Sequence, residues 1–318
     1  MKNVVVLYNL EAEWGEETPL KNSPETRASF EDFYDFARTL GFNFFRADVA
    51  WFDKEHGYFE KAWTFDQGRW QHVEKPVVPD AVFDKVAGKY DYELFPLKME
   101  MQKRFPVVNS PLFRTLFDNK LAQYLAFGEH MPRSFLAENE DQFKKNIKLL
   151  ATEKVVIKEL YGSGGKQVSI GEKAGLKIKN PAYPFLLQEF IETAGVPEVS
   201  SPGDVADLRL VYINNELIYA LSRIAKSGSL FTNFHQGAQA VLVPVEKIPD
   251  SCLAVAQAIN KKLFLSTNIN YSLDFMFTKE GEPLFIEMNT TPGFDLLRLV
   301  GTPTIKENYY RKLLATFE

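Results

Sequence analysis

The sequence predicts a protein of mixed α/β and α+β class, in which an N-terminal α/β domain precedes a larger region rich in strands. Three observations predict this class. An apolar strand, an amphipathic helix and a second strand open the chain, which is a β-α-β order. From about residue 153 onward, strand-like runs joined by short loops predominate. The 318 residues, 45% of them hydrophobic, suffice for two or three domains with buried cores.

The N-terminal domain is expected to extend to about residue 107. Its first strand covers residues 4–8, and its first helix lies between Ser23 and Gly41, with Pro24 in the first turn and Gly41 as the stop. A second strand follows at 42–47, then a hairpin whose strands contain Trp63 and Trp70, then a short apolar strand in "PVVPDAVFDKV". The aromatic residues of "WFDKEHGYF" and "AWTFDQGRW" are expected to pack this domain's own core, with a peptide groove as the alternative.

The second region begins with "VVNSPLFRTLFDNKLAQYLAFGEHMPRSF", which predicts a turn, one helix and an exit into a strand. An amphipathic helix is expected near 138–151, and residues 194–204 form a loop rich in Pro, Gly and Ser. The apolar pattern predicts strands in "KVVIKELYGSGGKQVSI", "FLLQEFIE", "DLRLVYIN" and "ELIYALSRIA", and a helix over 252–264.

Composition narrows the classes of function. The net charge of −5 provides no basic footprint for nucleic acid. No apolar run approaches the roughly 18 residues of a membrane helix, and the N-terminus resembles a core strand more than a signal peptide. The single cysteine, Cys252, excludes an intramolecular disulfide and is expected to be buried, and a cytoplasmic protein is expected. The four histidines show no metal-ligand spacing; only His235, close to Asn233, is of interest.

The stretch "YSLDFMFTKEGEPLFIEMN" predicts a hairpin that carries an unusual set of polar residues. If Glu280 and Gly281 form a two-residue turn, Asp274 lies directly opposite Glu287, at a spacing where two carboxylates repel. Asn289 shares the face of Glu287 because it lies two residues further along the strand. Two carboxylates and an amide oxygen are ligands that Mg²⁺ accepts, so the hairpin is either a metal site or a polar, solvent-exposed sheet edge.

A glycine loop, Gly162-Ser163-Gly164-Gly165, joins two of the predicted strands. It fits neither the GxxxxGK[ST] phosphate loop nor the GxGxxG dinucleotide pattern. It is either a plain hairpin loop or a flexible lid whose backbone N–H groups cover phosphates. Lys158 lies just upstream on an otherwise apolar strand, where an ammonium needs an anion or a polar acceptor nearby.

Eight short motifs then occur in a recognisable order: "DNK" at 118–120, "VIKELYGSGG" at 156–165, "LQEFI" at 187–191, "DLR" at 207–209, "SRIAK" at 222–226, "NFHQGA" at 233–238, "LDF" at 273–275 and "EMNTTPG" at 287–293. Over roughly residues 105–298 the chain therefore resembles the ATP-grasp superfamily. Within it, the chain is most similar to the glutathione-synthetase-like ligases, especially the RimK-type ligases that add glutamate to a ribosomal protein. The resemblance implies a pre-ATP-grasp domain at 1–107, a subdomain with the glycine-rich lid at 108–190, and a C-terminal subdomain with the magnesium site at 191–318.

The resemblance also implies roles for residues of this chain, with ATP and one or two Mg²⁺ ions as cofactors and Mn²⁺ able to replace Mg²⁺. The ATP-binding set is Lys120, Lys158, Gly162, Ser163, Gly164, Gly165, Gln188, Glu189, Phe190, Ile191 and Lys226. The metal ligands would be Asp274, Glu287 and Asn289, and Arg209, Arg223 and Asn233 would face the γ-phosphate and an acyl-phosphate intermediate. Arginines and magnesium are needed because a carboxylate attacking a phosphate brings two anions together.

The implied activity is a carboxylate–amine ligase that releases ADP and phosphate, with small-molecule or peptide substrates. The alternatives are a kinase that phosphorylates a small-molecule hydroxyl and a nucleotide-binding regulatory protein without turnover.

The chain departs from the pattern in three places. The segment "ETAGVPEVSSPGDVA" is long, which leaves open whether Glu192 or Glu198 holds the ribose, and "HQGA" replaces the more basic "HRGG", which puts a substrate role for Gln236 in doubt. The N-terminal domain matches nothing closely, and the acid, the amine and the oligomeric state are left open.

Overall fold

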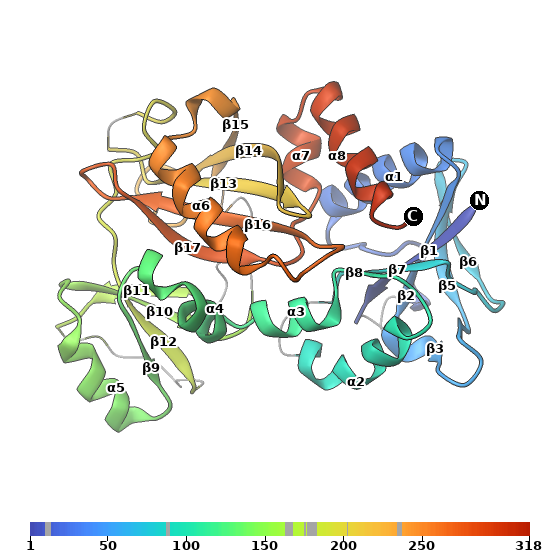
Figure 1. Ribbon diagram of the computed structural model, residues 1–318, viewed down its shortest axis with the longest axis horizontal. Helices are drawn as coiled ribbons and strands as arrows, with labels where there is room; N and C mark the ends of the chain where they lie inside the picture. Colours follow the sequence, from blue (N-terminus) through green and yellow to red (C-terminus); the bar gives the residue numbers. More distant parts are fainter. Residues whose placement is uncertain are drawn as a thin grey trace.

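Three sheets form the framework of the protein, seen in a computed structural model that describes residues 1–9, 14–86, 90–162, 168–174, 176, 183–201, 203–233 and 237–318 (Figure 1). The six-stranded sheet has the order β6-β5-β2-β1-β7-β8. Its elements are β1 (Lys2–Tyr8), β2 (Phe42–Asp48), β5 (Ala62–Asp66), β6 (Arg69–Val73), β7 (Ala81–Asp84) and β8 (Val107–Val108). β2, β1, β7 and β8 are mutually parallel, whereas β5 and β6 add an antiparallel edge.

The predicted β-α-β opening is confirmed by β1, α1 (Pro24–Thr39) and β2. Pro24 begins the helix, Gly41 follows it with a φ of 86°, and Ser23 occupies the N-cap position without a side-chain capping bond. α1 covers one face of the sheet and α2 (Tyr90–Gln102), which the sequence analysis missed, contributes to the core on the other. Aromatic side chains fill these two cores: Trp51, Phe52, Phe59, Trp63 and Trp70 are each at most 8% exposed. They therefore pack the domain itself, as expected.

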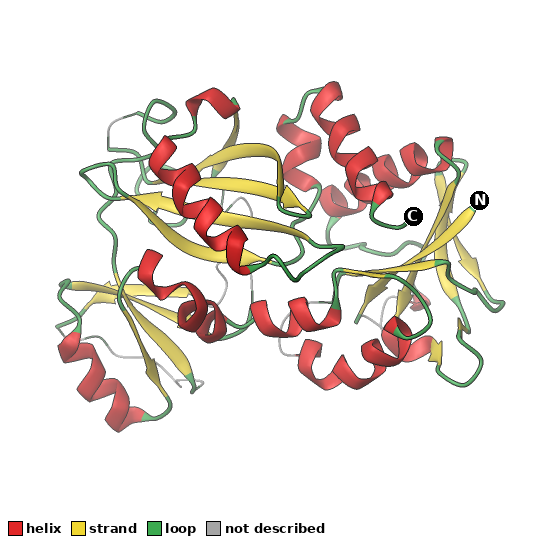
Figure 2. Ribbon diagram, viewed as in Figure 1, coloured by secondary structure: helices red, strands yellow, loops and turns green. Residues whose placement is uncertain are grey.

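The four-stranded sheet is antiparallel, with the order β11-β10-β12-β9. Its strands are β9 (Ser134–Ala137), β10 (Lys154–Glu159), β11 (Val168–Glu172) and β12 (Phe185–Glu189). The helix expected near 138–151 is shorter: α5 (Glu140–Asn146) continues only as the 3₁₀ turn η4 (Ile147–Leu149). Asn139 caps α5 by accepting from the backbone N–H of Gln142. This sheet and α5 form the lobe at the lower left of Figures 1 and 2.

The five-stranded sheet, β15-β14-β13-β16-β17, is antiparallel and covered on both faces. Its strands are β13 (Ala206–Ile213), β14 (Glu216–Ile224), β15 (Gln239–Val243), β16 (Asn270–Phe277) and β17 (Pro283–Asn289). One face packs on α6 (Asp250–Lys262), whose Cys252 is buried as expected, and on α3 (Pro111–Phe117) and α4 (Lys120–Phe127). Two helices now appear where one was predicted, because Asn119 caps the second by accepting from the N–H groups of Leu121 and Ala122.

Two C-terminal helices that the sequence analysis did not predict join the five-stranded sheet to the six-stranded one. α7 (Asp295–Val300) and α8 (Pro303–Ala315) lie between these sheets in Figure 1. Tyr309, Tyr310 and Leu313 share a single core with Phe33 of α1 and Tyr219 of β14. The N-terminal domain is thereby packed against the end of the chain.

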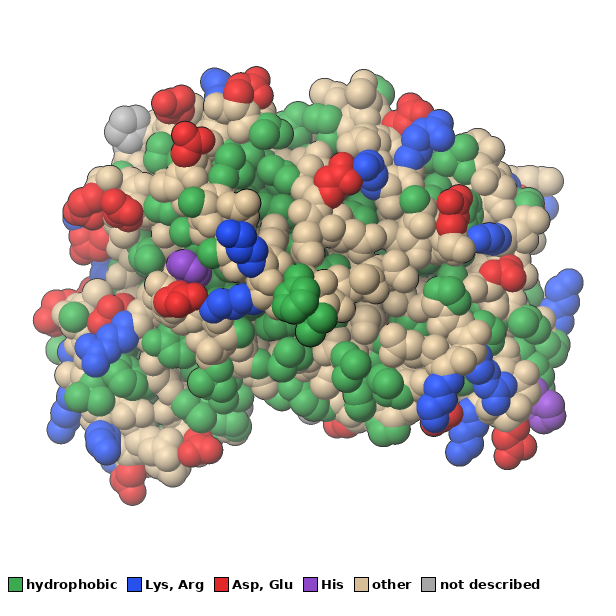
Figure 3. All heavy atoms as spheres, viewed as in Figure 1, with side chains coloured by type: hydrophobic (Ala, Val, Ile, Leu, Met, Phe, Trp, Pro, Cys, Tyr) green, Lys and Arg blue, Asp and Glu red, His purple; other side chains and the backbone are tan. Residues whose placement is uncertain are grey.

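The remaining short elements are β3 (Phe52–Asp53), β4 (Tyr58–Phe59) and the 3₁₀ turns η2 (Val49–Trp51), η3 (Gly128–His130) and η6 (Val245–Lys247). Within the described part of the chain, none of the helices is both long and apolar enough to span a bilayer. On the face shown in Figure 3, acidic and basic side chains are intermixed and no large area carries one sign of charge.

Candidate functional site

A pocket lies between the four-stranded and the five-stranded sheets. Its open space is about 830 Å³, which includes solvent at its mouth. One wall comes from β10, β11 and β12, the other from β13, β14, β16 and β17, and the lining residues 190–191 directly follow β12. The lining combines apolar side chains with a few charged ones: Val156, Lys158, Val168, Ile170, Gln188, Glu189, Phe190, Ile191, Val205, Asp207, Arg223, Leu230, Phe231, Thr232, Asn233, Asp274, Met276, Ile286 and Glu287. An apolar slot with convergent charges at one side is typical of a site for an anionic ligand that has an apolar body.

Lys158 is the basic group of the β10–β12 wall. Its side chain is 6% exposed, and no described residue accepts a hydrogen bond from it. Burial lowers its pKa to about 8, against the opposing charge of Glu287. A buried ammonium without an acceptor is costly, and an anionic ligand in the pocket would satisfy it.

Lys120 begins α4 and reaches toward the same region from outside the pocket lining. Its Nζ donates to the carbonyl of Gly162 at 2.6 Å and lies 3.9 Å from Glu287 Oε2. At 8% exposure it is not the solvated helix lysine that its position alone would suggest. Gly162 adopts a φ of 112°, which favours glycine. Ser163, Gly164 and Gly165 lie outside the described residues.

The segment 188–191, which is the end of β12 and the two residues after it, lines the pocket throughout. Gln188 is buried and donates from Nε2 to Ser134 Oγ at 2.9 Å, whereas Glu189 Oε1 accepts from the N–H of Ala151 at 2.7 Å. These side chains are therefore held by β9 and the turn before β10. Phe190 and Ile191 also line the pocket, and the N–H of Phe190 donates to Thr152 Oγ1 at 3.3 Å.

A β-bulge in the hairpin of β16 and β17 brings the acidic residues to the pocket. Asp274 pairs with Glu287, as predicted, but the turn is not the predicted two-residue Glu280–Gly281 turn. The connection has three residues, so near the turn each residue pairs one position away from the predicted register, and Phe275 faces Phe285. The bulge between Asp274 and Phe275 adds one residue on β17, and beyond it the pairing returns to the predicted register. Without the bulge, Glu287 would share the face of Phe285, which is fully buried in the core. The extra residue lets Ile286 and Glu287 both line the pocket.

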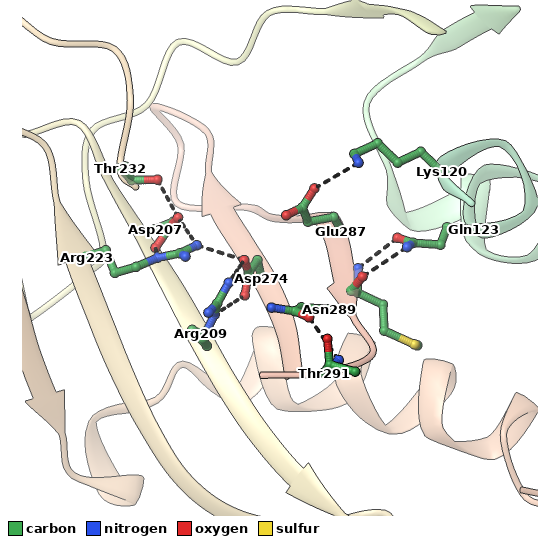
Figure 4. Close-up of polar contacts among 11 residues, drawn as sticks. Lys120, Gln123, Asp207, Arg209, Arg223, Thr232, Asp274, Glu287, Asn289 and Thr291 are labelled. Atoms are coloured by element: carbon green, nitrogen blue, oxygen red, sulfur yellow. Dashed lines mark hydrogen bonds and ion pairs between the residues drawn. The ribbon is translucent and has the colours of Figure 1, made fainter. Parts of the chain in front are cut away.

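Four charged residues form a buried network beside this hairpin (Figure 4). Arg209 donates from Nε and Nη2 to the two carboxylate oxygens of Asp274, at 2.7 and 2.6 Å. Arg223 donates from Nε and Nη2 to the two carboxylate oxygens of Asp207, at 2.9 and 2.6 Å. Its Nη2 also donates to Asp274 Oδ2, at 2.7 Å. Such fork-to-carboxylate pairs fix both geometry and charge.

Ionisation in this network follows from its burial and pairing. Burial acts to raise the pKa of Asp274, but Arg209 and Arg223 outweigh it and lower that pKa to about 2. Burial also raises the pKa of Asp207, against the opposing charge of Arg223. Burial opposes the charge of Arg223, but Asp207 and Asp274 overcome it and raise the guanidinium pKa above its ordinary value. Arg223 therefore stays charged at any working pH.

Sequence reasoning missed Asp207 and Thr232, which belong to this network. Thr232 donates its hydroxyl to Asp207, and both residues line the pocket. A signal for Asp207 was present: it stands two residues before Arg209 on a strand and so shares its face, with the buried Leu208 between them. No comparable signal marked Thr232, which lies in a loop.

The other predicted site residues differ in where they lie. Asn233 lines the pocket, whereas Lys226 is exposed in a turn and does not. Glu192 pairs with Lys279 at the surface and Glu198 is exposed, and neither contributes to the pocket lining. His235 and Gln236 lie outside the described residues.

The donor set of Asp274, Glu287 and Asn289 fits a hard cation. Glu287 accepts no hydrogen bond from any described side chain or backbone group, and its nearest cation is Lys120 at 3.9 Å. Asn289 lies beside Asp274 in Figure 4, and its Oδ1 accepts a single bond, from the N–H of Thr291 at 2.9 Å. Among the described residues no three His, Cys, Asp or Glu side chains form a metal-competent cluster, so a cation held here would need an oxygen of another type, such as the Asn289 amide. Three oxygen ligands that leave other positions open are characteristic of Mg²⁺ bound together with phosphates.

Similarity to known proteins agrees with this geometry. The family profile of the RimK-like ATP-grasp domain matches residues 120–309, more than half of the chain. The chain belongs to the RimK-like ATP-grasp family. The predicted resemblance is therefore confirmed.

Relatives of this RimK-like chain include curated and solved proteins. It is 31% identical over 183 residues to a probable alpha-L-glutamate ligase of Vibrio parahaemolyticus, a match that spans 54% of either protein. A probable alpha-L-glutamate ligase of Psychromonas ingrahamii is 26% identical over 258 residues, or 76% of this chain and 78% of the relative. The chain thus spans about half the length of the first relative.

The fold of the RimK-like chain is that of ATP-grasp ligases. The ATP-grasp ligase PsnB, solved with a variant of its minimal precursor, Mg and ADP, superposes with a TM-score of 0.60 at 13% identity, covering 100% of this chain and 99% of PsnB. This likeness confirms the predicted fold class. The PsnB complex contains Mg and ADP.

Proposed function

We propose that the protein is an ATP- and Mg²⁺-dependent ligase that joins the carboxylate of an amino acid or peptide to an amine through an acyl phosphate, and releases ADP and phosphate. The observation that carries this proposal is the buried Lys158, which lacks a described acceptor and lines one pocket together with the carboxylates of Asp207, Asp274 and Glu287 and the guanidinium of Arg223. That arrangement suits a polyphosphate bound between a cation on one side and a metal site on the other.

The nucleotide would lie with its base in the apolar part of the pocket. The backbone at Phe190 and Ile191 would contact the base, next to Gln188 and Glu189, and all four residues line the pocket. Lys158 and Lys120 would neutralise the phosphates. Gly162, Ser163, Gly164 and Gly165 would form the loop that covers them, and Lys120 already contacts this loop at Gly162. Lys226 would approach only from the rim, because its side chain is exposed.

Asp274, Glu287 and Asn289 would hold one or two Mg²⁺ ions. When bound, the metal offsets the charge that two anions bring together at the γ-phosphate. The chain's own contribution is the bulge, which points Glu287 into the pocket, and the N–H of Thr291, which orients the Asn289 amide. Arg209 and Arg223 keep Asp274 ionised at neutral pH; its Oδ2 accepts from both arginines, whereas Oδ1 accepts only from Arg209 and keeps a lone pair for a metal.

Arg209, Arg223 and Asn233 would face the reacting groups. In the first step, a carboxylate oxygen of the acid attacks the γ-phosphorus and ADP leaves, which yields an acyl phosphate. In the second step, the amine attacks the acyl carbon, the C–O bond breaks, phosphate leaves and the nitrogen loses a proton. Fixed arginines favour both steps because each places negative charge on oxygens they can contact. The boundaries 1–107, 108–190 and 191–318 are proposed as the pre-ATP-grasp domain and the two subdomains around the pocket.

The test is to incubate the protein with ATP, Mg²⁺ and a panel of amino acids and short peptides, with L-glutamate first because the curated relatives bear its name. Ligation requires ADP and phosphate to appear together, in proportion to an amide product identified by mass. A phosphorylated product without free phosphate would instead indicate the kinase alternative. Nucleotide binding without any turnover would indicate the regulatory protein.

Nucleotide binding is predicted to weaken as pH rises through about 8. The cause is Lys158, whose pKa is lowered to about 8 by burial, so that it is charged below that pH and neutral above it. A phosphate favours the charged form, so the affinity for a non-hydrolysable ATP analogue should fall by up to about tenfold per pH unit above 8. Calorimetric titrations between pH 6.5 and 9.5 would measure this. The Lys158→Arg variant should lose the dependence because its guanidinium does not titrate there; an unchanged profile in that variant would contradict the assignment.

A further inference from the structure

Gln123 is a buried amide on α4, three residues after Lys120. Its side chain is 2% exposed. Its Nε2 donates to the carbonyl of Phe117 at 2.7 Å and to that of Met288 at 3.0 Å, and its Oε1 accepts from the N–H of Met288 at 2.7 Å. The amide therefore places both of its N–H groups and its oxygen on backbone groups. Two of these three bonds go to one residue of β17.

Met288 lies between two proposed metal ligands, Glu287 and Asn289, on the last strand of the five-stranded sheet. The N–H and C=O of one residue point to the same side of an antiparallel strand. Both groups of Met288 reach Gln123, so they point away from β16, and the side-chain amide takes the place that a further strand would occupy. Figure 4 shows these two bonds on the strand that carries Glu287 and Asn289.

Bonds to the main chain restrict how β17 can twist or shift at this point. Mg²⁺ demands near-ideal octahedral geometry, so its ligands have to be held to within about 0.5 Å. Residues close to Gln123 contact side chains of the same stretch: Asp118 accepts from the Thr290 hydroxyl, and Lys120 Nζ lies 3.9 Å from Glu287 Oε2. Of these contacts, those of Gln123 act on the backbone between the two proposed ligands.

An apolar side chain would suit the surroundings of Gln123 if its role were only to fill space. Phe117 and Phe127, which precede and follow it in the chain, belong to one apolar core together with Phe285. An apolar residue in place of Gln123 would leave the N–H and the C=O of Met288 without this partner, and unsatisfied backbone groups in a core are costly. The amide is therefore explained by the strand that it holds.

We propose that Gln123 is a positioning residue of the metal site. By pairing with the backbone of Met288, it holds β17 so that Glu287 and Asn289 present their oxygens with the geometry that a hard divalent cation requires. This inference rests on the proposed function, because it takes Glu287 and Asn289 as metal ligands. It requires that the loss of the Gln123 amide weakens metal binding and leaves the binding of the nucleotide without metal unchanged.

The first measurement requires neither metal nor nucleotide. Isotopic labelling of methionine alone gives few backbone amide signals in an NMR spectrum, because the sequence has only 6 methionines, and Met288→Leu identifies the signal of Met288. In the wild type this amide should exchange slowly with solvent, and in Gln123→Leu at least about tenfold faster. Equal exchange rates in the two proteins would overturn the proposal. So would a wild-type Met288 amide that exchanges as fast as one in an unstructured peptide, a result that does not depend on the variant being folded.

The second measurement is the affinity for Mn²⁺ in the presence of ADP, followed by electron paramagnetic resonance. Gln123→Leu should weaken Mn²⁺ binding by about 10- to 100-fold, the range typical for the loss of a residue that orients metal ligands. The affinity for ADP without metal, measured by calorimetry, should stay unchanged. Gln123→Glu should recover part of the lost Mn²⁺ affinity, because a buried carboxyl is protonated and can both accept from the Met288 N–H and donate one O–H.

Asn146→Leu is the matched control, because it also removes a side-chain amide that donates to a backbone carbonyl, that of Leu136 at 2.8 Å, but in the lobe of the four-stranded sheet. It should lower the thermal unfolding midpoint and leave Mn²⁺ affinity unchanged. The proposal is refuted if Gln123→Leu binds Mn²⁺ like the wild type, or if it weakens metal-free ADP binding as much as Mn²⁺ binding, as a general structural defect would.

The outcomes separate this inference from the ligase function. Mn²⁺ binding that depends on Gln123, in a wild-type protein that forms no ADP or amide product with any acceptor of the panel, would support the positioning role and refute the ligase. Amide formation by the wild type, together with unchanged Mn²⁺ affinity in Gln123→Leu, would leave the ligase standing and refute the positioning role.

Discussion

Replacing Glu287 with glutamine is expected to reduce Mg²⁺-dependent turnover by at least about 100-fold while the protein stays folded. Glu287 points into the pocket with a side chain that is 23% exposed, and its only described ionic contact is Lys120 at 3.9 Å. The substitution keeps its shape and removes the charge that a metal would need. Asp274 is a poorer choice for this experiment because its carboxylate also anchors two buried arginines.

The measurement is ADP release over a range of Mg²⁺ concentrations, with the thermal unfolding midpoint as the check on folding. Glu287→Gln should also weaken the binding of Mn²⁺ in the presence of ADP, which electron paramagnetic resonance detects without turnover. Glu192→Gln is the matched control, since that carboxylate pairs with Lys279 away from the pocket. Turnover like that of the wild type in Glu287→Gln would remove this residue from the metal site.

Replacing Arg223 with methionine is expected to cost about 3–5 kcal/mol of unfolding free energy and to abolish turnover. The guanidinium is 6% exposed and makes three hydrogen bonds to Asp207 and Asp274. Removing it leaves Asp207, whose pKa burial already raises, with only the hydroxyl of Thr232 as a described partner. The loss arises mainly because a buried charge is left unpaired.

A second substitution separates stability from catalysis. In Arg223→Met combined with Asp207→Asn, the unpaired charge is gone, so urea denaturation should show recovery of part of the lost stability. Turnover should remain absent, because the arginine proposed to face the γ-phosphate is still missing. If the double variant lost as much unfolding free energy as the sum of the losses in the two single variants, the ion pair between Arg223 and Asp207 would not be the cause of the instability. If Arg223→Met retained turnover, its proposed role would be wrong.

Much of the fold could be predicted because local patterns agreed with the final packing. The β1-α1-β2 opening, the hairpin of β5 and β6, and the strands on either side of the glycine loop follow from apolar periodicity and turn residues. The helices α7 and α8 were not predicted: α7 has only 6 residues and no side-chain N-cap bond, whereas α8 does carry start signals in Thr302 and Pro303. α2 escaped as well, and it carries Pro96 in its interior, a residue that argues against a helix.

Several site residues could be proposed from motif order, but their surroundings could not. Sequence reasoning placed Asp274 opposite Glu287 through an incorrect turn, and the agreement arose only because a bulge cancelled the shift. It gave Arg209 and Arg223 phosphate-facing roles without foreseeing that Asp207 and Asp274 hold them. Pairing across strands depends on register, and register depends on bulges that leave little trace in composition.

The sequence by itself determined the family, the strand on which Lys158 lies and the acidic hairpin, because these depend on residue types at short, fixed spacings. Tertiary structure alone decided that Lys158 is buried without a described acceptor, that Arg223 binds two carboxylates, and that Gln123 pairs with the backbone of Met288. These features join residues that are far apart in the chain. Their energies come from burial and from hydrogen-bond geometry, which exist only once the sheets and the C-terminal helices have packed together.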